Sequence, residues 1–459
     1  MFAGASSITR ERVAAGLAVG LAAPVGAIAV LSPRVALAAV VSIVFVATAV
    51  VDLAAGLAVF VTITFFALIP GIGTSFISVV KLAGAALLLA LGRKKGLPSL
   101  LHDHPLLAAL AVALGVWAFA SALWAPEVGH ARGRALTLVL GIVLVFIVYG
   151  AVREPKHARW LVRGYIAGAV LSALVGLFVT APATTDTTRL SGGIGDPNEL
   201  ALVLVPGLAL AFFAIPGAQG EIERWLLILS AGAIALALFQ TGSRGGLIAL
   251  AAAFIAAVIF GGSRRPHVFA GLLGLTALGV AYFVLAAPPA VTGRVLHFTA
   301  GGGSGRTDLW AIARQVAHDH PIVGIGIGNF EDVEAAYASR TTNLPAVDIV
   351  IDNPHVVHNS YLELLAELGV VGLALFVAFV AGALTLGWRA VRAFTRSGDT
   401  DLELIGRGLL VALAGMLAAS VFLSAEYEKQ LWLLLGFAIA LTTLTRARTP
   451  ARSVPTGAD

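Results

Sequence analysis

Residues 105–124 read PLLAALAVALGVWAFASALW and contain no charged side chain. A helix that crosses a lipid bilayer needs about 20 consecutive, mostly apolar residues, which is the length of this run. Comparable runs recur along the chain, at about residues 13–31, 35–51, 53–70, 75–92, 135–151, 160–180, 200–215, 225–240, 247–262, 267–287, 364–388, 404–424 and 430–446. Because only Asp52 and small residues separate the second run from the third, the pattern predicts about 12–14 transmembrane helices.

The composition of the whole chain supports the same fold class. Of its 459 residues 59% are hydrophobic and only 12% are charged, whereas soluble domains carry about 25% charged residues. A transmembrane β-barrel would show alternating segments of about ten residues, and the apolar runs here are continuous. We therefore predict an all-α, polytopic membrane helix bundle, in which the run at 13–31 is an uncleaved first helix rather than a signal peptide.

The distribution of basic residues predicts the orientation in the membrane. Cytoplasmic loops carry an excess of Lys and Arg. With the N-terminus in the cytoplasm, the cytoplasmic loops contain Arg10, Arg12, Arg93, Lys94, Lys95, Arg153, Lys156, Arg159, Arg264, Arg265, Arg389, Arg392, Arg396, Arg446, Arg448 and Arg452. The opposite short loops, such as 71–74, are nearly bare. We expect both termini to be cytoplasmic, and we assign the net charge of +5 to these loops rather than to nucleic-acid binding.

A long polar connection between about residues 288 and 361 is expected on the outer side. Loops of this length without a function are uncommon. Thr307 is a candidate helix cap with Asp308 in the first turn. Apolar residues then follow at helical spacing (Leu309, Ile312, Ala313 and Val316) and predict a short amphipathic helix.

The chemistry-bearing residues gather in four polar segments, all expected on the outer side. Segment 1 is 188–199 (TRLSGGIGDPNE), segment 2 is 241–246 (TGSRGG), segment 3 is 305–308 (GRTD) and segment 4 is 355–363 (HVVHNSYLE). Arg244 in segment 2 lies between two apolar runs, close to the hydrocarbon boundary. A charge at membrane depth costs roughly 2.5–3.5 kcal/mol and by default indicates a functional site, although an arginine that reaches the lipid headgroups is the alternative.

Arginines of other segments point to the same ligand chemistry. Arg189 and Arg306 have glycines nearby, which let backbone N–H groups approach an anion. Guanidinium groups match phosphate oxygens in a bidentate manner. Arg189, Arg244 and Arg306 together are what a lipid-linked diphosphate at the interface requires, although each alone can be a solvated loop charge.

His358 is the candidate general base. Its ordinary pKa of about 6.5 suits removal of a proton from a sugar hydroxyl at neutral pH. His355 lies one turn away if the segment is helical, and His318 and His320 lie upstream. A histidine-rich metal site is the competing reading, but no carboxylate at short spacing and no HExxH pattern accompanies these histidines.

Two further features have structural interpretations. The run 324–330 (GIGIGNF) fails the spacing of a dinucleotide loop and is interpreted as a tight backbone passage that shapes the long connection. Lys81 is expected in the outer half of a transmembrane helix, where it can reach an anion or simply the lipid headgroups. The chain has no cysteine, which excludes disulfides and thiolate chemistry.

Several short motifs follow one another in the second half of the chain. They are Arg189 with GDPNE (195–199), TGSRG (241–245), Gly305–Arg306 with Trp310, HPIVGIGIGNF (320–330) and HNSYL (358–362) before Gly369. In this order the chain resembles the O-antigen ligase / O-antigen polymerase family of bacterial membrane glycosyltransferases. The resemblance covers about residues 185–440, and the N-terminal half adds only a compatible run of helices.

The resemblance implies an inverting, metal-independent glycosyltransferase of the GT-C type in the bacterial cytoplasmic (inner) membrane, without a cofactor. The donor would be a glycan on undecaprenyl diphosphate, and the acceptor a glycan or lipid-anchored hydroxyl on the extracytoplasmic side. Arg189, Arg244 and Arg306 resemble the diphosphate-binding residues, and His358 resembles the catalytic histidine. The supporting residues would be Asn198, Asn359 and Tyr361.

Alternatives remain within this prediction. A ligase and a polymerase share donor and mechanism and differ in the acceptor, which no residue identifies. A flippase for the same lipid-linked glycans is less favoured, because its ionisable residues would lie at mid-membrane and its halves would repeat. We expect residues 1–180 to be N-terminal transmembrane helices, and 181–459 the ligase-like catalytic region with the outer loop at 288–361.

Overall fold

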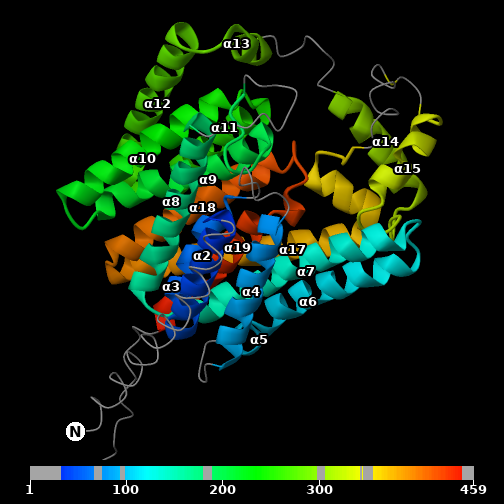
Figure 1. Ribbon diagram of the computed structural model, residues 1–459, viewed down its shortest axis with the longest axis horizontal. Coiled ribbons are helices and arrows are strands. Elements are labelled where there is room, and N and C mark those ends of the chain that lie inside the picture. The colour runs from blue at the N-terminus through cyan, green and yellow to red at the C-terminus, as the bar shows by residue number, and fades with distance from the viewer. Residues whose placement is uncertain are drawn as a thin grey trace, which may run out of the picture.

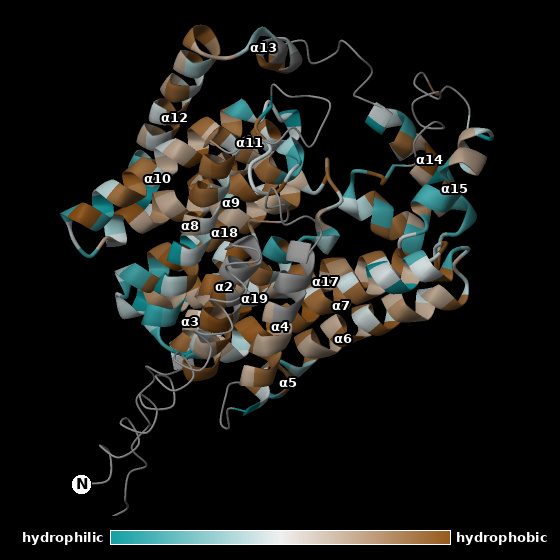
Figure 2. Cartoon of the chain, in the orientation of Figure 1, coloured by the Kyte–Doolittle hydropathy of each residue, from teal (hydrophilic) through white to brown (hydrophobic). Residues whose placement is uncertain are grey.

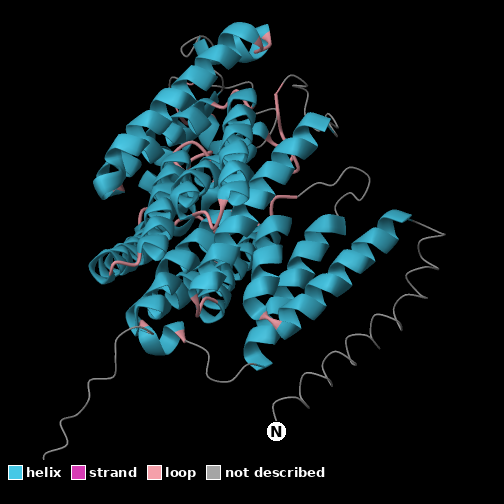
Figure 3. Ribbon diagram, turned by 90° about the vertical axis from the view of Figure 1, so that its left-hand side faces the viewer, coloured by secondary structure: helices cyan, strands magenta, loops and turns pink. Residues whose placement is uncertain are grey.

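The computed structural model describes residues 33–66, 75–93, 99–178, 189–296, 305–341, 344 and 355–446, and these residues contain helices and no strand (Figures 1 and 3). The predicted all-α class is confirmed. The first predicted run, at 13–31, lies outside the described residues. Figure 2 shows apolar helices with polar residues gathered at the helix ends and over α14 and α15.

The helices coincide with the apolar runs read from the sequence. Their bounds are α2 Pro33–Val51, α3 Leu53–Ile63, α4 Ser75–Arg93, α5 Leu100–Asp103, α6 Pro105–Ala120, α7 Val128–Ala151, α8 Pro155–Phe178, α9 Pro197–Ala214, α10 Glu221–Gln240, α11 Arg244–Phe260, α12 Arg265–Leu285, α13 Pro289–Leu296, α14 Arg306–Asp319, α15 Phe330–Ala338, α17 Ser360–Ser397, α18 Thr400–Ala419 and α19 Lys429–Arg446. Within the described residues, eight helices are long and apolar enough to span a membrane, and shorter apolar helices lie at 53–63, 83–93, 244–260 and 429–445. The protein is a multi-pass membrane protein.

The doubtful second and third runs are separate helices. Asp52 lies between α2 and α3 and accepts hydrogen bonds from the N–H groups of Ala54 and Ala55, so it caps α3. A Cβ on Gly56 would approach Ala49 to 2.5 Å, so the two helices pack closely beside this cap. A single polar residue is therefore enough to end one apolar helix and begin the next.

The centre of the bundle is a continuous apolar core that includes residues from α3 to α19. Trp432 on α19 is fully buried, and a Cβ on Gly141 of α7 would lie 2.4 Å from its ring. Small residues thus let α7 and α19 approach closely, which is the packing expected for helices in lipid.

Polar contacts divide the bundle into two ends. At one end Arg159 pairs with Asp401 at 2.6 Å, and Arg163 pairs with Glu223 at 2.6 Å. These contacts join the first turns of α8, α10 and α18, at the end of the bundle where the predicted cytoplasmic residues Arg153, Lys156 and Arg159 lie. At the opposite end segments 1 and 2 contact each other, and Trp310 of α14, just after segment 3, contacts segment 4, as described below. The side of the membrane that each end faces stays a prediction.

The long connection carries the short helices α13, α14 and α15. The predicted amphipathic helix is confirmed as α14, whose residues Leu309, Ile312 and Val316 are buried. The predicted cap was wrong. Gly305, with a φ of 77°, is the N-cap rather than Thr307, and Asp308 lies in the first turn as expected. Glycine takes this left-handed conformation without the steric cost of a Cβ, so the helix begins earlier, at Arg306.

Candidate functional site

Each of the four polar segments ends at, or contains, the N-terminus of a helix. Asp196 caps α9 through the N–H groups of Asn198 and Glu199, and Ser243 caps α11 through Gly246. Gly305 precedes α14, and Asn359 caps α17 through Tyr361 and Leu362. Helix N-termini carry partial positive charge and unsatisfied N–H groups, which favour anions. Only the helix start in segment 3 was predicted from the sequence, although Asp196, Ser243 and Asn359 are residue types that commonly cap helices.

Segments 1 and 2 are joined by Arg189. Its Nε donates to the carbonyl of Thr241 at 2.7 Å, and its Nη2 donates to Oδ1 of Asn198 at 2.9 Å. The N–H of Leu190 donates to the carbonyl of Gln240 at 3.2 Å. The predicted residues Arg189 and Asn198 therefore lie side by side, beside the loop that leads to Arg244.

Segment 2, segment 4 and the first turns of α14 meet around two aromatic residues. Trp310 on α14 donates from Nε1 to the carbonyl of Val357 at 3.1 Å, and its ring lies 6.1 Å from that of Phe422. A Cβ on Gly245 would lie 3.2 Å from Cβ of Phe422. Arg244 and Arg306, both half-buried, are the first residues of α11 and α14, so these contacts hold their backbones at the same end of the bundle.

His358 has an unusual backbone and a polarised environment. Its φ is 54°, the left-handed region that non-glycine residues rarely adopt. Burial, which is the largest cause, and the charges of Arg306 and His355 together lower its pKa to about 4, while the charge of Asp196 opposes them. His358 therefore interacts electrostatically with residues of segments 1 and 3. At neutral pH its ring is uncharged, which is the form that accepts a proton, but it is a weaker base than its ordinary pKa suggested.

His355 is not one helical turn from His358, because residues 355–359 are not helical and α17 begins at Ser360. The N–H of His355 instead donates to Oε2 of Glu334 at 2.7 Å. Burial raises the pKa of Glu334 to about 7. His318 and His320 lie at the far end of α14, roughly 20 Å along the helix from Arg306 at 1.5 Å per residue. Among the described residues no group of three or more His, Asp or Glu is placed to hold a metal ion.

The start of α17 is fixed by hydrogen bonds to the loop that follows α18. The N–H of Ser360 donates to the carbonyl of Ser420 at 2.8 Å, and its Oγ accepts from the N–H of Ala425 at 2.7 Å. The hydroxyl of Tyr361 donates to the carbonyl of Leu417 at 2.8 Å. Asn359 and Tyr361 therefore hold the backbone next to His358 in place.

The glycine run 324–330 is a tight passage, as predicted. Gly324, Gly326 and Gly328 all have positive φ, and a Cβ on Gly324 would lie 2.2 Å from the backbone of Glu367. The Glu367 carboxylate accepts hydrogen bonds from the N–H groups of Gly328 at 2.7 Å and Phe330 at 3.2 Å. The long connection is thus bound to α17 two turns after His358.

Buried acidic residues lie beside this passage and were not singled out in the sequence. Glu363, Glu367 and Glu426 are at most 2% exposed, and Ser424 donates to Glu363. Arg134 on α7 interacts with Glu363 and Glu367 and lies 4.9 Å from the centre of the Tyr427 ring. The sequence signal that could have indicated them is the spacing of Glu363 and Glu367 by four residues at the start of an apolar helix, which places both on one face. Lys81 lies in α4, and its side chain is outside the described part of the structure.

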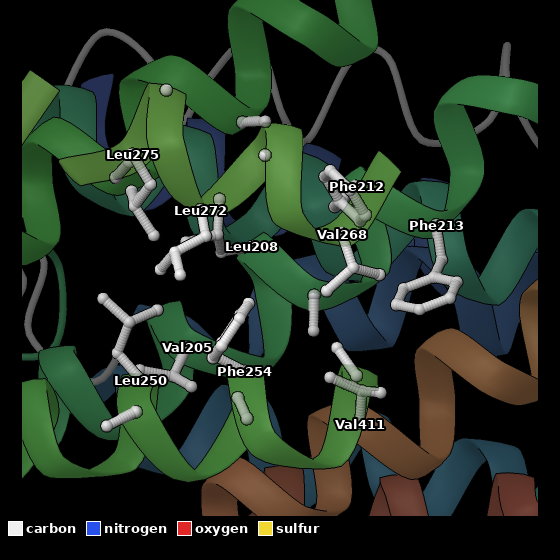
Figure 4. Close-up of a pocket in the computed structure, with 18 of the residues that line it drawn as sticks. Val205, Leu208, Phe212, Phe213, Leu250, Phe254, Val268, Leu272, Leu275 and Val411 are labelled. Carbon is white, nitrogen blue, oxygen red and sulfur yellow. The ribbon is translucent and has the colours of Figure 1, made fainter. Parts of the chain in front are cut away.

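An apolar cavity of about 720 Å³ lies between α9, α10, α11 and α12 (Figure 4). All of its lining residues are apolar, and Figure 4 shows Leu250 and Phe254 of α11 facing Leu272 and Leu275 of α12 across it. Leu247, also in its lining, is one helical turn from Arg244. We call it the α9–α12 cavity. Because Ile255 is 59% exposed, the cavity is also accessible from the lipid-facing surface.

The chain was compared with known proteins. Residues 227–377, which include Arg244, Arg306 and His358, match the family described as O-antigen ligase. This part of the chain is therefore similar to the O-antigen ligase family. It is 28% identical over 326 residues to an O-antigen ligase of Pseudomonas aeruginosa, covering 69% of this chain and 71% of that protein. It is also 23% identical over 358 residues to the teichuronic acid biosynthesis protein TuaE of Bacillus subtilis, covering 72% and 70%. The predicted family resemblance is confirmed.

Proposed function

We propose that this chain is a member of the O-antigen ligase family and acts as an inverting, metal-independent glycosyltransferase. It transfers a glycan from an undecaprenyl-diphosphate carrier to an acceptor hydroxyl on the outer face of the cytoplasmic membrane, and both of its termini are cytoplasmic. The observation that carries the proposal is the meeting of Arg189, Arg244, Arg306 and His358 through their segments at one end of the bundle.

The donor diphosphate is assigned to the arginines. Arg244 and Arg306 begin α11 and α14, so each guanidinium adds its charge to that of a helix N-terminus. Arg189 is oriented by Thr241 and Asn198. Cationic groups placed where negative charge develops stabilise a leaving group without a metal ion. The α9–α12 cavity begins one turn below Arg244, and its purely apolar lining suits the polyprenyl chain of such a donor.

His358 is assigned as the base. It accepts the proton of the acceptor hydroxyl while that oxygen attacks the anomeric carbon of the donor sugar. The bond from this carbon to the diphosphate oxygen breaks, and the electron pair leaves with the diphosphate beside the arginines. Attack from the face opposite the leaving group inverts the anomeric centre. Bound diphosphate also offsets the charge of Arg306, so the donor itself raises the pKa of His358 towards its ordinary value.

With respect to the acceptor, we favour a ligase over a polymerase. The Pseudomonas aeruginosa relative is named as an O-antigen ligase, and residues 227–377 match the family of that description. Polymerisation of lipid-linked repeat units uses the same donor chemistry and differs only in the acceptor. The relative from Bacillus subtilis, named for teichuronic acid biosynthesis, keeps that second reading open.

A transfer assay tests the proposal. Purified full-length protein is supplied with a synthetic undecaprenyl-diphosphate glycan and candidate acceptors in the presence of EDTA, beside His358→Ala and Arg244→Ala. We expect transfer by the parent, donor binding without transfer by the histidine variant, and weakened donor binding by the arginine variant. Transfer that survives His358→Ala overturns the base assignment. Movement of the donor across proteoliposomes without any transfer would instead identify a flippase.

A further inference from the structure

Another apolar cavity, of about 350 Å³, lies on the other side of the bundle between α3, α4 and α7. Its lining includes Phe60, Gly84, Leu88 and Leu140. Leu88 is 46% exposed and Leu140 is 43% exposed, so the cavity opens laterally to the surrounding lipid. We call it the α3–α4–α7 groove. It shares no lining residue with the α9–α12 cavity.

Unlike the α9–α12 cavity, the groove has polar residues in its lining, namely Thr137, Tyr427 and Lys429. Lys429 begins α19 and interacts electrostatically with Glu199. Within the described residues Lys429 forms no salt bridge with a distance of 4.0 Å or less. A cation at one end of an apolar groove is complementary to a lipid whose headgroup is anionic.

The polar end of the groove adjoins the candidate site. A Cβ on Gly193 of segment 1 would lie 2.7 Å from the ring of Phe66, which lines the groove. Tyr427 donates to Glu367 at 3.2 Å, and Ala425, two residues earlier, donates to Ser360 of segment 4. The groove therefore reaches segments 1 and 4, whereas the α9–α12 cavity reaches segment 2 beside Arg244.

We propose that the α3–α4–α7 groove holds the hydrocarbon chain of a lipid-anchored acceptor, with Lys429 contacting its anionic headgroup. This inference rests on the proposed function and makes the acceptor a membrane lipid rather than a protein. The donor chain enters from the α9–α12 side and the acceptor chain from the α3–α4–α7 side. The reacting hydroxyl then approaches His358 from the side opposite the diphosphate, as inversion requires.

Glycines in α4 provide a variant and a matched control. A Cβ on Gly84 would meet no neighbouring atom within 4 Å, because the glycine faces the open groove. Gly84→Leu thus fills the groove without a clash. Gly92 lies on the same helix, also has no neighbour within 4 Å of an added Cβ, and does not line the groove. Gly92→Leu is therefore the same chemical change outside the groove.

The experiment uses the full-length chain in nanodiscs of phosphatidylcholine. The probe is phosphatidylglycerol with a photoreactive group on one acyl chain, and the cross-linked peptides are located by mass spectrometry. We expect saturable labelling of α4 and α7, reduced about tenfold by Gly84→Leu, a change that corresponds to one decade in affinity, and unchanged by Gly92→Leu. Lys429→Gln should abolish the preference for this probe over photoreactive phosphatidylcholine.

Other outcomes overturn the inference. Labelling that does not saturate, or that is equal for both probes and unchanged in Gly84→Leu, would identify ordinary contact with bulk lipid. In parallel, binding of undecaprenyl diphosphate is measured on the same preparations. Loss of that binding in Gly84→Leu would assign the groove to the donor and overturn the acceptor role. Absence of binding in the parent itself would overturn the proposed function, while the labelling would still show separately whether the groove takes an anionic lipid.

Discussion

The α9–α12 cavity and the α3–α4–α7 groove differ in size and in polarity. The cavity, of about 720 Å³, is lined by apolar residues alone, while the groove, of about 350 Å³, includes Lys429 and Tyr427. In the cavity's case the charge lies one turn beyond its lining, at Arg244. For the proposed donor, the arginines bind the diphosphate, so the α9–α12 cavity needs to supply only apolar contacts to the hydrocarbon chain. For the proposed acceptor, the anionic headgroup needs a separate cationic side chain, and the groove supplies Lys429.

The largest expected effect comes from removing the proposed base. His358→Ala should lower kcat by about 10²–10⁴-fold, the range for loss of a positioned base. Binding of undecaprenyl diphosphate and labelling by phosphatidylglycerol should both persist, because neither ligand chain contacts this side chain. Isothermal titration and single-turnover transfer measure the two quantities. If the variant also lost either ligand, His358 would have a role in binding rather than in proton transfer.

The next prediction separates the two chain sites directly. Gly232 lines the α9–α12 cavity, and a Cβ added there would meet no atom within 4 Å. Gly232→Leu should raise the KM for the donor roughly tenfold or more, since added methylenes in a hydrophobic pocket are worth about 1–3 kcal/mol. Gly84→Leu should raise the acceptor KM by a similar factor and leave the donor KM alone. Steady-state kinetics, with the donor and the acceptor varied in turn, measure the two KM values. If each variant raised both KM values, the cavity and the groove would not be separate sites for donor and acceptor.

The pH dependence of His358 is expected to respond to the donor. Its pKa of about 4 lies below the value of about 6.5 in the unfolded chain, so the unfolded state binds more protons between these values. The contribution of His358 to the free energy of unfolding is therefore fully present above about pH 6.5 and is lost as the pH decreases towards 4. Burial is the main cause and Arg306 the next, so Arg306→Gln should raise this pKa and Asp196→Asn should lower it.

Nuclear magnetic resonance of the labelled His358 ring provides the measurement. Undecaprenyl diphosphate should raise the pKa of the ring, because its charge offsets that of Arg306. Phosphatidylglycerol, held at Lys429, should raise it less. An equal shift with both lipids would place the two headgroups at the same distance from His358 and contradict the division between the cavity and the groove.

A smaller effect is expected from the anchor of the glycine run. Each oxygen of the Glu367 carboxylate accepts a backbone N–H, from Gly328 or from Phe330. Glu367→Gln replaces one oxygen with an NH₂ group that cannot accept, which leaves a buried N–H unpaired at a cost of about 1–3 kcal/mol. Thermal unfolding should show this loss, with Glu127→Gln at an exposed position as the control. Because Glu367 also accepts from Tyr427, the acceptor KM should rise while the donor KM stays unchanged.

The sequence anticipated the helices and the glycine run 324–330 better than the contacts between them. Asp52 showed where α2 and α3 divide, and the positions of Gly324, Gly326 and Gly328 required a tight backbone, because both features depend on local conformation alone. The cap of α14 was misplaced because Gly305 and Thr307 are both acceptable caps, and only the path of the chain decides between them. The site residues Arg189, Arg244, Arg306 and His358 remain a prediction, now with contacts that join their segments.

Burial explains the features that were missed. The pKa of His358 is set by burial and by the charges of Arg306, His355 and Asp196. Arg306 and Asp196 are far from His358 in the sequence, and only the fold brings them close enough to affect it. Glu363 and Glu367 are ordinary helix residues by propensity, and their partners lie in the loops around 328 and 424. The open space beside Gly84 is likewise invisible in a sequence, because it depends on what three helices leave unfilled.

The smallest expected effect tests which polar residue of the groove matters. The hydroxyl of Thr137 donates to the carbonyl of Gly133 at 3.0 Å, one turn earlier in the same helix. Since this bond stays within α7, Thr137→Val removes polarity that the ligand does not need. The acceptor KM should change by no more than about twofold, less than 0.5 kcal/mol, as for most substitutions away from specific contacts. Lys429→Gln should change it more, because only the lysine offers a charge. If Thr137→Val matched Lys429→Gln in acceptor KM and in the loss of preference for phosphatidylglycerol, hydrogen bonding rather than charge would select the headgroup. The groove would then take a neutral lipid, and its contrast with the α9–α12 cavity would be one of size alone.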